Sequence, residues 1–251
     1  MSRLLRIVGA TLALGIYFAL APIGYAVFAV WSGLPSPRPE ARRRRFQRIL
    51  HRAFRGMHAL VKRLDLVDFA PESVRGRAPD VPCLLVANHP TLVDISALLA
   101  TLDPVVFPVK PGLYRRFWAR PLLATAGAFE GPGADPIGVA AFVETAVARL
   151  QRGDRVLVFP EGTRSSGAMP DAFGRAAIEI AVRAEVPVVP ISIRCEPRWL
   201  TKESRLLSPP SAVPQLHVHI LEAIPAPTRD SSSRELRDIV QSRIQTDLDS
   251  A

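Results

Sequence analysis

Cysteine is scarce in this chain of 251 residues: the sequence holds only Cys83 and Cys195, each inside an apolar stretch. Such scarcity favours buried free thiols in a reducing compartment over a disulfide framework, and two cysteines alone make a poor metal site. The chain also has no G-x-S-x-G nucleophile elbow, so a serine nucleophile of that kind is not expected. Gly131-x-Gly133 lacks the third glycine and the preceding strand of a dinucleotide-binding motif, which argues against that class.

Charged residues are absent from Ile7 to Trp31. As a helix, this stretch would be about 37 Å long, which is enough to cross a bilayer. We therefore predict a membrane-embedded segment over residues 1–35. Because Pro22 and Gly24 could kink it, a tilted span and a re-entrant hairpin both remain open. A secretory signal peptide is the alternative, but the apolar run exceeds the usual h-region of about 7–15 residues.

Acidic residues are outnumbered, with 23 of them against 32 lysines and arginines, so the net charge is +9 and anionic partners are favoured. The arginines gather directly after the apolar run, at Arg38, Arg42 to Arg45, Arg48, Arg52 and Arg55. Apolar residues recur at helical spacing from Ala41 to about Leu66. Within residues 36–78 this predicts a basic amphipathic helix lying on anionic membrane lipids, with an ordinary surface helix as the alternative.

The same arginines bear on location and on nucleic acid. Zinc-ligand spacing is missing, so lipid explains a basic run beside an apolar span better than nucleic acid does. The positive-inside rule places the basic side in the cytoplasm. We therefore expect the inner (cytoplasmic) membrane as the location, with the globular part on its cytoplasmic side and no nucleic acid partner.

Beyond this helix, short apolar runs alternate with helical patterns. The runs that predict strands are residues 83–87, 105–109, 156–159, 186–193 and 216–220. The patterns that predict helices are residues 91–102, 113–126, 139–151 and 176–184. The alternation predicts an α/β domain over residues 79–226, with a mixed sheet flanked by helices. Pro187 and Pro190 favour an edge position for their strand. Residues 227–251 should form a final amphipathic helix that starts at a capping box of Ser232 and Glu235.

A first motif, Asn88-His89-Pro90-Thr91-Leu92-Val93-Asp94, follows the first predicted strand. Pro90 at the first helical position would place His89 at the N-cap and Asp94 just over one turn inside the helix. Helical side chains lean toward the N-terminus, so the Asp94 carboxylate can reach His89. A carboxylate that accepts a hydrogen bond from one nitrogen of the imidazole fixes the tautomer, so the other ring nitrogen is free to act as a base. A capping role alone is the alternative for His89.

A second motif, Phe159-Pro160-Glu161-Gly162-Thr163-Arg164-Ser165, follows another predicted strand. Gly162 suits a tight turn that brings backbone N–H groups close to a ligand, and Arg164 offers a planar donor fork for phosphate. Glu161 could bind an acceptor hydroxyl, anchor the turn, or form an ion pair with Arg164. Together the motifs supply a base, an acid to orient it and a turn with a cation, which suits the transfer of an acyl group to a hydroxyl.

With both motifs, the chain resembles the lysophospholipid acyltransferase superfamily, the glycerol-phosphate and lysophosphatidic acid acyltransferases with an HX4D motif. Residues 82–193 carry the resemblance, including a fourth block at 186–190 and a second block around Lys110 and 127–129. It implies His89 and Asp94 as catalytic residues. The substrate-binding residues that it implies are Glu161, Gly162, Thr163, Arg164, Asn88 and Lys110. It implies no metal and no cofactor, with acyl-CoA or acyl carrier protein as the acyl donor and a lipid hydroxyl as the acceptor.

The second block departs from the family, which usually has an arginine about two residues after the phenylalanine to help hold the acceptor phosphate. Here Phe129 is followed by Glu130. A carboxylate beside an anionic acceptor costs binding, so an amino-acid lipid or another specialised lipid alcohol competes with a plain glycerophosphate acceptor. Arg115, Arg116 or Arg120 could replace the missing arginine. A non-catalytic lipid-binding homologue and a lipid hydrolase remain alternative functions.

Overall fold

The computed structural model describes residues 8–9, 30, 38–102, 104–204 and 209–250. The membrane-embedded segment predicted over residues 1–35 lies almost wholly outside them, so it stays a prediction. Among the described residues, none of the helices combines the length and the apolar character that a bilayer crossing requires. The predicted division of the chain into domains also stays a prediction.

The centre of the molecule is a mixed four-stranded sheet in the order β4-β1-β5-β6. Its strands are β1 (Leu84–Ala87), β4 (Val156–Val158), β5 (Val188–Glu196) and β6 (Gln215–Ile220). β1 runs parallel to both β4 and β5, whereas β6 is antiparallel to β5. A second, parallel pair consists of β2 (Phe107–Val109) and β3 (Ala128–Glu130), and a parallel bridge from Val106 to Val156 places this pair beside β4. The predicted mixed α/β sheet is confirmed.

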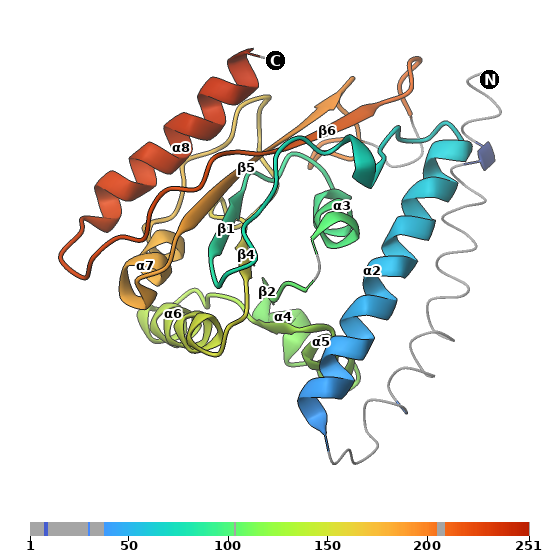
Figure 1. Cartoon of the computed structure of the whole chain (residues 1–251). Coiled ribbons are helices and arrows are strands. Elements are labelled where there is room, and N and C mark those ends of the chain that lie inside the picture. Colours follow the sequence, from blue (N-terminus) through green and yellow to red (C-terminus); the bar gives the residue numbers. More distant parts are fainter. Residues whose placement is uncertain (1–7, 10–29, 31–37, 103, 205–208, 251) are drawn as a thin grey trace.

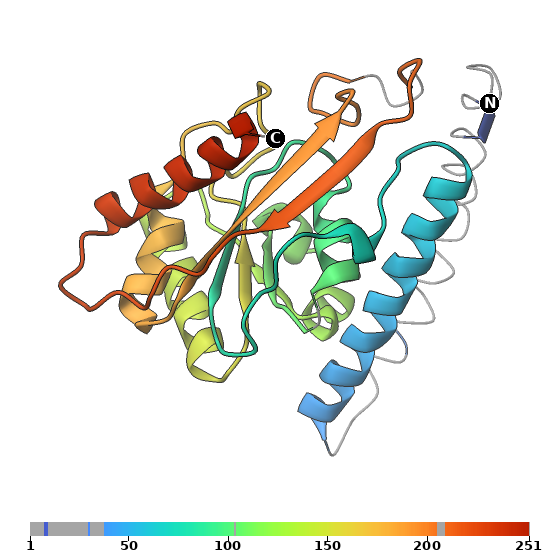
Figure 2. The same ribbon diagram turned by 45° about the horizontal axis from the view of Figure 1, so that its top comes forward.

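Helices cover both faces of the sheet (Figures 1 and 2). They are α2 (Pro39–Arg63), α3 (Asp94–Thr101), α4 (Pro111–Tyr114), α5 (Arg120–Ala126), α6 (Pro136–Gln151), α7 (Arg175–Ala184) and α8 (Ser233–Ser250), with a 3-10 turn η1 at Pro71–Ser73. Successive residues of a strand point to opposite faces. Leu85 and Ala87 therefore join the core on the α3 side, and Leu84 and Val86 join the core with α6, α7 and α8.

The edge position predicted for the strand with Pro190 is wrong, because β5 lies between β1 and β6. The Pro190 carbonyl accepts a hydrogen bond from the Leu221 N–H at 2.9 Å, just beyond the last residue of β6. The missing N–H of Pro190 therefore faces the end of the β5–β6 ladder, and the ladder with β1 loses no donor.

The basic amphipathic helix is present as α2. Phe46 and His58 are buried on the face that packs against α3 and α5, and the opposite face exposes arginines. The exposed arginines of α2 are Arg44, Arg45, Arg48, Arg52 and Arg63. At the other end of the chain, the Ser232 hydroxyl accepts a hydrogen bond from the Glu235 N–H at 3.3 Å, as the capping box predicts.

His58 fastens α2 to α3. Its Nε2 lies 3.1 Å from the hydroxyl of Ser96, which itself donates to the Val93 carbonyl. Nε2 is therefore the donor, and the buried Nδ1 has no hydrogen-bond partner in the described structure. Burial lowers the pKa of His58 from 6.5 to about 4, because a second N–H would have no acceptor.

Acidification should therefore destabilise the protein through His58. Between pH 6.5 and about 4 the unfolded chain binds a proton at His58 that the folded chain does not bind. The free energy of unfolding therefore decreases as the pH is lowered through this range. The loss reaches up to about 3 kcal/mol at the acid end. Urea unfolding at several pH values should show this slope, and His58→Phe should reduce it. An unchanged slope in His58→Phe would show that His58 does not titrate in this way.

Asn88 joins the end of β1 to β5. Its amide nitrogen donates to the Ile193 carbonyl at 2.8 Å, and its amide oxygen accepts from the Ile193 N–H at 2.7 Å. The residue is 1% exposed. Both functional groups of Asn88 are therefore used inside the protein, and the substrate-binding role that the resemblance implied stays a prediction that these contacts do not support.

Replacing Asn88 with Ala should leave the buried N–H and carbonyl of Ile193 without partners. We expect a loss of about 2–4 kcal/mol in the free energy of unfolding. Denaturant unfolding measures this loss, and steady-state kinetics supplies the contrast. Unchanged stability together with a raised KM for the acceptor would instead support a substrate-binding role for Asn88.

Candidate active site

The first motif forms a tight turn between β1 and α3. The helix begins at Asp94, not at Pro90, so the prediction that His89 is an N-cap residue is wrong. The Leu92 N–H donates to the Leu200 carbonyl at 2.9 Å, outside any helical ladder. The Thr91 N–H donates to the Asp94 carboxylate at 2.7 Å. These contacts hold residues 91–93 in a turn and delay the start of the helix.

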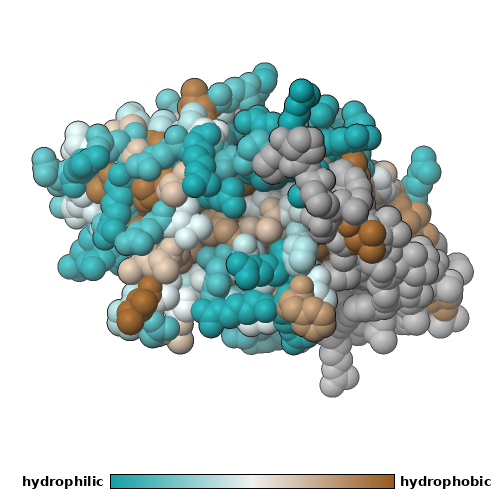
Figure 3. Space-filling view, turned by 90° about the horizontal axis from the view of Figure 1, so that it is seen from below, coloured by the Kyte–Doolittle hydropathy of each residue, from teal (hydrophilic) through white to brown (hydrophobic). Residues whose placement is uncertain are grey.

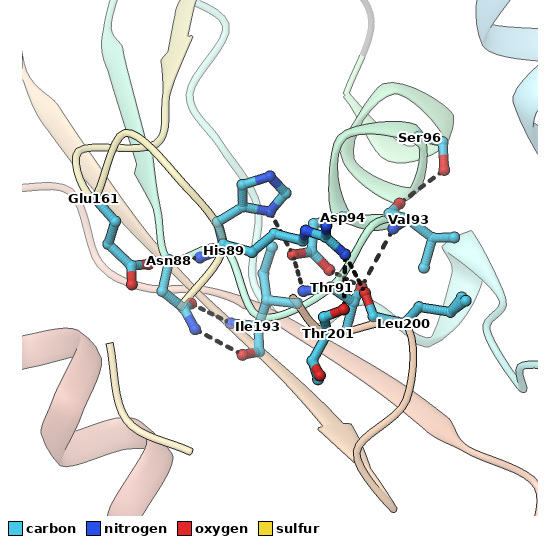
Figure 4. A network of polar contacts seen from close by, with 11 residues as sticks. Asn88, His89, Thr91, Val93, Asp94, Ser96, Glu161, Ile193, Leu200 and Thr201 are labelled. Carbon is cyan, nitrogen blue, oxygen red and sulfur yellow. Dashed lines mark hydrogen bonds and ion pairs between the residues drawn. The ribbon is translucent and has the colours of Figure 1, made fainter. Parts of the chain in front are cut away.

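The predicted contact between His89 and Asp94 is present despite the later helix start. Nδ1 of His89 lies 2.8 Å from Oδ2 of Asp94 (Figure 4). The imidazole ring also stacks on Phe159 of the second motif, with centroids 4.4 Å apart. The side chain of His89 is 21% exposed and that of Asp94 is fully buried. An ionised Asp94 fixes the proton on Nδ1, so Nε2 is the nitrogen that can act as a base.

Asp94 is a buried carboxyl group with three donors around it. Besides His89 these are the N–H and the hydroxyl of Thr91. Burial raises the pKa of Asp94, and the hydrogen bonds from His89 and Thr91 act in the opposite direction. In such surroundings a protonated imidazole is the partner that best compensates the carboxylate.

Glu161 ties the two motifs together. Its two carboxylate oxygens accept hydrogen bonds from the backbone N–H groups of His89 and Asp171, each at 2.8 Å. A return bond runs from the Ser165 N–H to the His89 carbonyl at 2.8 Å. Burial raises the pKa of Glu161, and these hydrogen bonds oppose the shift. Of the roles considered for Glu161, anchoring the turn is the one that these contacts support.

Arg164 makes contacts that the sequence did not suggest. Its Nη1 donates to the carbonyls of Leu200 and Thr201, at 3.0 and 2.8 Å, and these contacts do not support the ion pair with Glu161 that was one of the alternatives. Leu200 has a left-handed backbone with φ +58°, and its carbonyl also accepts the Leu92 N–H. The segment after β5 is thus part of the site, and no local sequence signal marked it.

The remaining predicted residues lie on the same edge of the sheet. Gly162 adopts φ +69° in the turn after β4, and its N–H donates to the Phe159 carbonyl at 3.1 Å, so the predicted tight turn is present. Thr163 follows it and is half-buried. Lys110 comes directly after β2 and is exposed. Because β1, β2 and β4 are parallel, these residues all follow carboxyl ends at one edge, where open α/β sheets bind ligands.

The second block carries an ion pair at the end of β3. Nε and Nη2 of Arg115 lie 2.7 and 2.6 Å from the same oxygen of Glu130. Of the three arginines considered as replacements for the missing one, Arg115 is therefore held by Glu130, the acid that directly follows Phe129. The pair offers a cation and an anion side by side on the edge that carries His89.

The chain is similar to several known acyltransferases. A chloroplastic 1-acyl-sn-glycerol-3-phosphate acyltransferase, BAT2 from Brassica napus, is 31% identical over 118 residues, 45% of this chain and 33% of the relative. A lyso-ornithine lipid O-acyltransferase from Pseudomonas aeruginosa is 36% identical over 125 residues, 48% of this chain and 46% of the relative. The chain thus spans a third to a half of the length of these two relatives.

The crystal structure of PlsC, a 1-acyl-sn-glycerophosphate acyltransferase from Thermotoga maritima, shares the fold with a TM-score of 0.69. It is 24% identical, and the match covers 99% of this chain and 95% of that one. The family model described as Acyltransferase matches residues 41–194, which include both motifs. The resemblance inferred from the two motifs is therefore confirmed, and the chain belongs to the Acyltransferase family.

Proposed function

We propose that this protein transfers a fatty acyl group from an acyl thioester, acyl-CoA or acyl carrier protein, to the hydroxyl of a lysophospholipid-like lipid. The observation that carries the proposal is the hydrogen bond from Nδ1 of His89 to the buried Asp94 carboxylate. It orients Nε2 as a base at the sheet edge that carries the Gly162 turn. Family membership supports the reaction class, and the printed names of the relatives support a lipid acceptor.

The reaction needs no covalent enzyme intermediate. Nε2 of His89 takes the proton of the acceptor hydroxyl while its oxygen forms a bond to the thioester carbonyl carbon. The tetrahedral intermediate then collapses, the carbon–sulfur bond breaks, and the imidazolium returns the proton to the leaving thiolate. Asp94 stabilises the imidazolium between these steps. Backbone N–H groups at the start of α3 or in the Gly162 turn are the candidates for stabilising the oxyanion.

A lipid hydrolase would use the same base on water, and a non-catalytic homologue would only bind lipid. The intact constellation of His89, Asp94, Glu161 and Arg164 favours catalysis over binding alone, since each makes the contacts described above. Release of free fatty acid without acceptor, at a rate that matches transfer, would favour the hydrolase.

We also propose that the enzyme works at the cytoplasmic face of the inner membrane. The exposed arginines of α2 support this placement, because each basic residue near an anionic surface contributes about 1 kcal/mol of attraction. The apolar run from Ile7 to Trp31 supplies the proposed anchor.

His89→Ala should abolish acyl transfer, and Asp94→Asn should lower it about 10³-fold or more, since an amide does not hold the imidazolium as a carboxylate does. Mass spectrometry of the acylated lipid, with acyl-CoA and acyl carrier protein donors tested separately, measures the product. The matched control is His219→Ala. Nδ1 of His219 lies 2.7 Å from Asp247 in a similar pair outside the site, so turnover should be retained. Near-normal turnover in His89→Ala would falsify the assignment.

The acceptor headgroup, we propose, lies against Arg115 and Glu130. An ion pair presents both signs of charge, so it suits a zwitterionic headgroup such as that of an amino-acid lipid better than a phosphate alone. The lyso-ornithine lipid O-acyltransferase among the relatives is consistent with this choice.

Glu130→Arg should therefore shift the acceptor preference. The substitution removes the anionic partner for an ammonium group and adds a cationic partner for a phosphate. We expect the ratio of activity on lysophosphatidic acid to activity on lyso-ornithine lipid to rise about tenfold, which corresponds to one charge contact of about 1.4 kcal/mol. Competition of the two acceptors in one assay measures the ratio. The same ratio in wild type and variant would mean that the headgroup does not contact Glu130.

A further inference from the structure

The connection between β2 and β3 exposes apolar side chains that a folded protein usually buries. Phe117 and Trp118, in the turn that links α4 to α5, are 87% and 41% exposed. Leu113 on α4 is also 41% exposed. Figure 3 looks onto the end of the molecule where α4 and α5 lie, and apolar patches stand there among hydrophilic surface. Neighbouring exposed aromatic residues of this kind mark a contact surface.

Arginines surround these aromatic residues. The guanidinium of Arg116 lies 5.5 Å from the centre of the Trp118 ring, and Arg120 is exposed at the start of α5. Residues 111–126 contain no acidic residue. Aromatic side chains with basic neighbours suit the boundary between lipid headgroups and acyl chains, where Trp is favoured and Arg meets phosphate. A protein surface rich in acids would match the arginines but not the apolar rings.

The position of this connection relates it to the site. α4 follows the carboxyl end of β2, on the sheet edge that carries His89, and α5 packs against α2. The aromatic turn thus leads into a helix that packs against α2, whose outer face exposes arginines.

We propose that residues 111–126, here named the interfacial loop, dock on an anionic phospholipid bilayer. Phe117 and Trp118 enter the headgroup boundary, and Arg116 and Arg120 contact lipid phosphates. This contact is separate from the anchor proposed at residues 1–35. It would hold the sheet edge that carries His89 against the membrane surface, where a lipid acceptor resides, and this role rests on the proposed function.

Quenching of Trp118 by brominated lipids tests the contact locally, whatever else holds the chain on the membrane. The full-length Trp31→Phe variant retains Trp118 and the buried Trp199, which is 4% exposed. It is added to vesicles of brominated phosphatidylcholine with equal phosphatidylglycerol, or with phosphatidylcholine alone. We expect Trp118 emission to fall by a third or more with the anionic vesicles only. The double variant with Trp31→Phe and Trp118→Phe retains only Trp199, so it gives the background emission of that residue.

Variants then separate the charges from the rings. Arg116→Glu and Arg120→Glu should each raise, at least fivefold, the concentration of anionic vesicles needed for half-maximal quenching. A basic residue near such a surface contributes about a factor of five in binding. Phe117→Ser should also weaken it. Val81→Ser is the matched control, because Val81 is 48% exposed before β1, at the opposite sheet edge. It should leave quenching unchanged.

The outcomes separate this proposal from the proposed function. Quenching without acyl transfer would support the interfacial loop and overturn the function. Acyl transfer without quenching would overturn the loop and leave the function standing. A change in Trp118 emission on adding acyl carrier protein, with none on adding vesicles, would assign the surface to the carrier and overturn the proposal.

Discussion

The buried carboxylate of Asp94 is the constraint on which the site depends. A charge removed from water needs partners with good geometry, and this one is surrounded by the Thr91 N–H, the Thr91 hydroxyl and Nδ1 of His89. Meeting that need fixes the turn before α3, the start of the helix and the orientation of the imidazole. The hydrogen bond to His89 that helps to compensate the buried charge of Asp94 also leaves Nε2 as the nitrogen that the proposed mechanism uses as a base.

A second carboxylate holds the site to the rest of the sheet. Glu161 accepts hydrogen bonds from the backbone N–H groups of His89 and Asp171, and the Leu200 carbonyl accepts hydrogen bonds from the Leu92 N–H and from Arg164. Residues far apart in the sequence are thus held by backbone groups, whose positions follow from the parallel order of β1 and β4. The family motifs are in this sense partly structural, because they build the sheet edge that carries His89.

Periodicity was enough to locate the main strands and most helices within a few residues, because apolar runs and amphipathic faces are local properties. The helix predicted over residues 113–126 is instead split into α4 and α5 by a turn at residues 115–119. β3 was not predicted because Ala128-Phe129-Glu130, between Gly127 and Gly131, forms no apolar run. The inner position of β5 was not predicted because Pro190 faces the end of the β5–β6 ladder, where its missing N–H costs no hydrogen bond with β1. The pair of His89 and Asp94 was predictable from spacing, although the helix start was not, because Leu92 and Thr91 are held by tertiary contacts. The partners of Arg164 and of Glu130 depend on loops that no local signal places.

The central claim is that Nε2 of His89 faces the acceptor hydroxyl. A crystal structure of the protein with a non-reactive acyl thioester analogue and a lysolipid acceptor tests it most directly. The account predicts the hydroxyl oxygen within about 2.6–3.2 Å of Nε2, while Nδ1 keeps its bond to Asp94. An acceptor hydroxyl bound out of reach of His89, or an imidazole turned away from Asp94 in the complex, would contradict it.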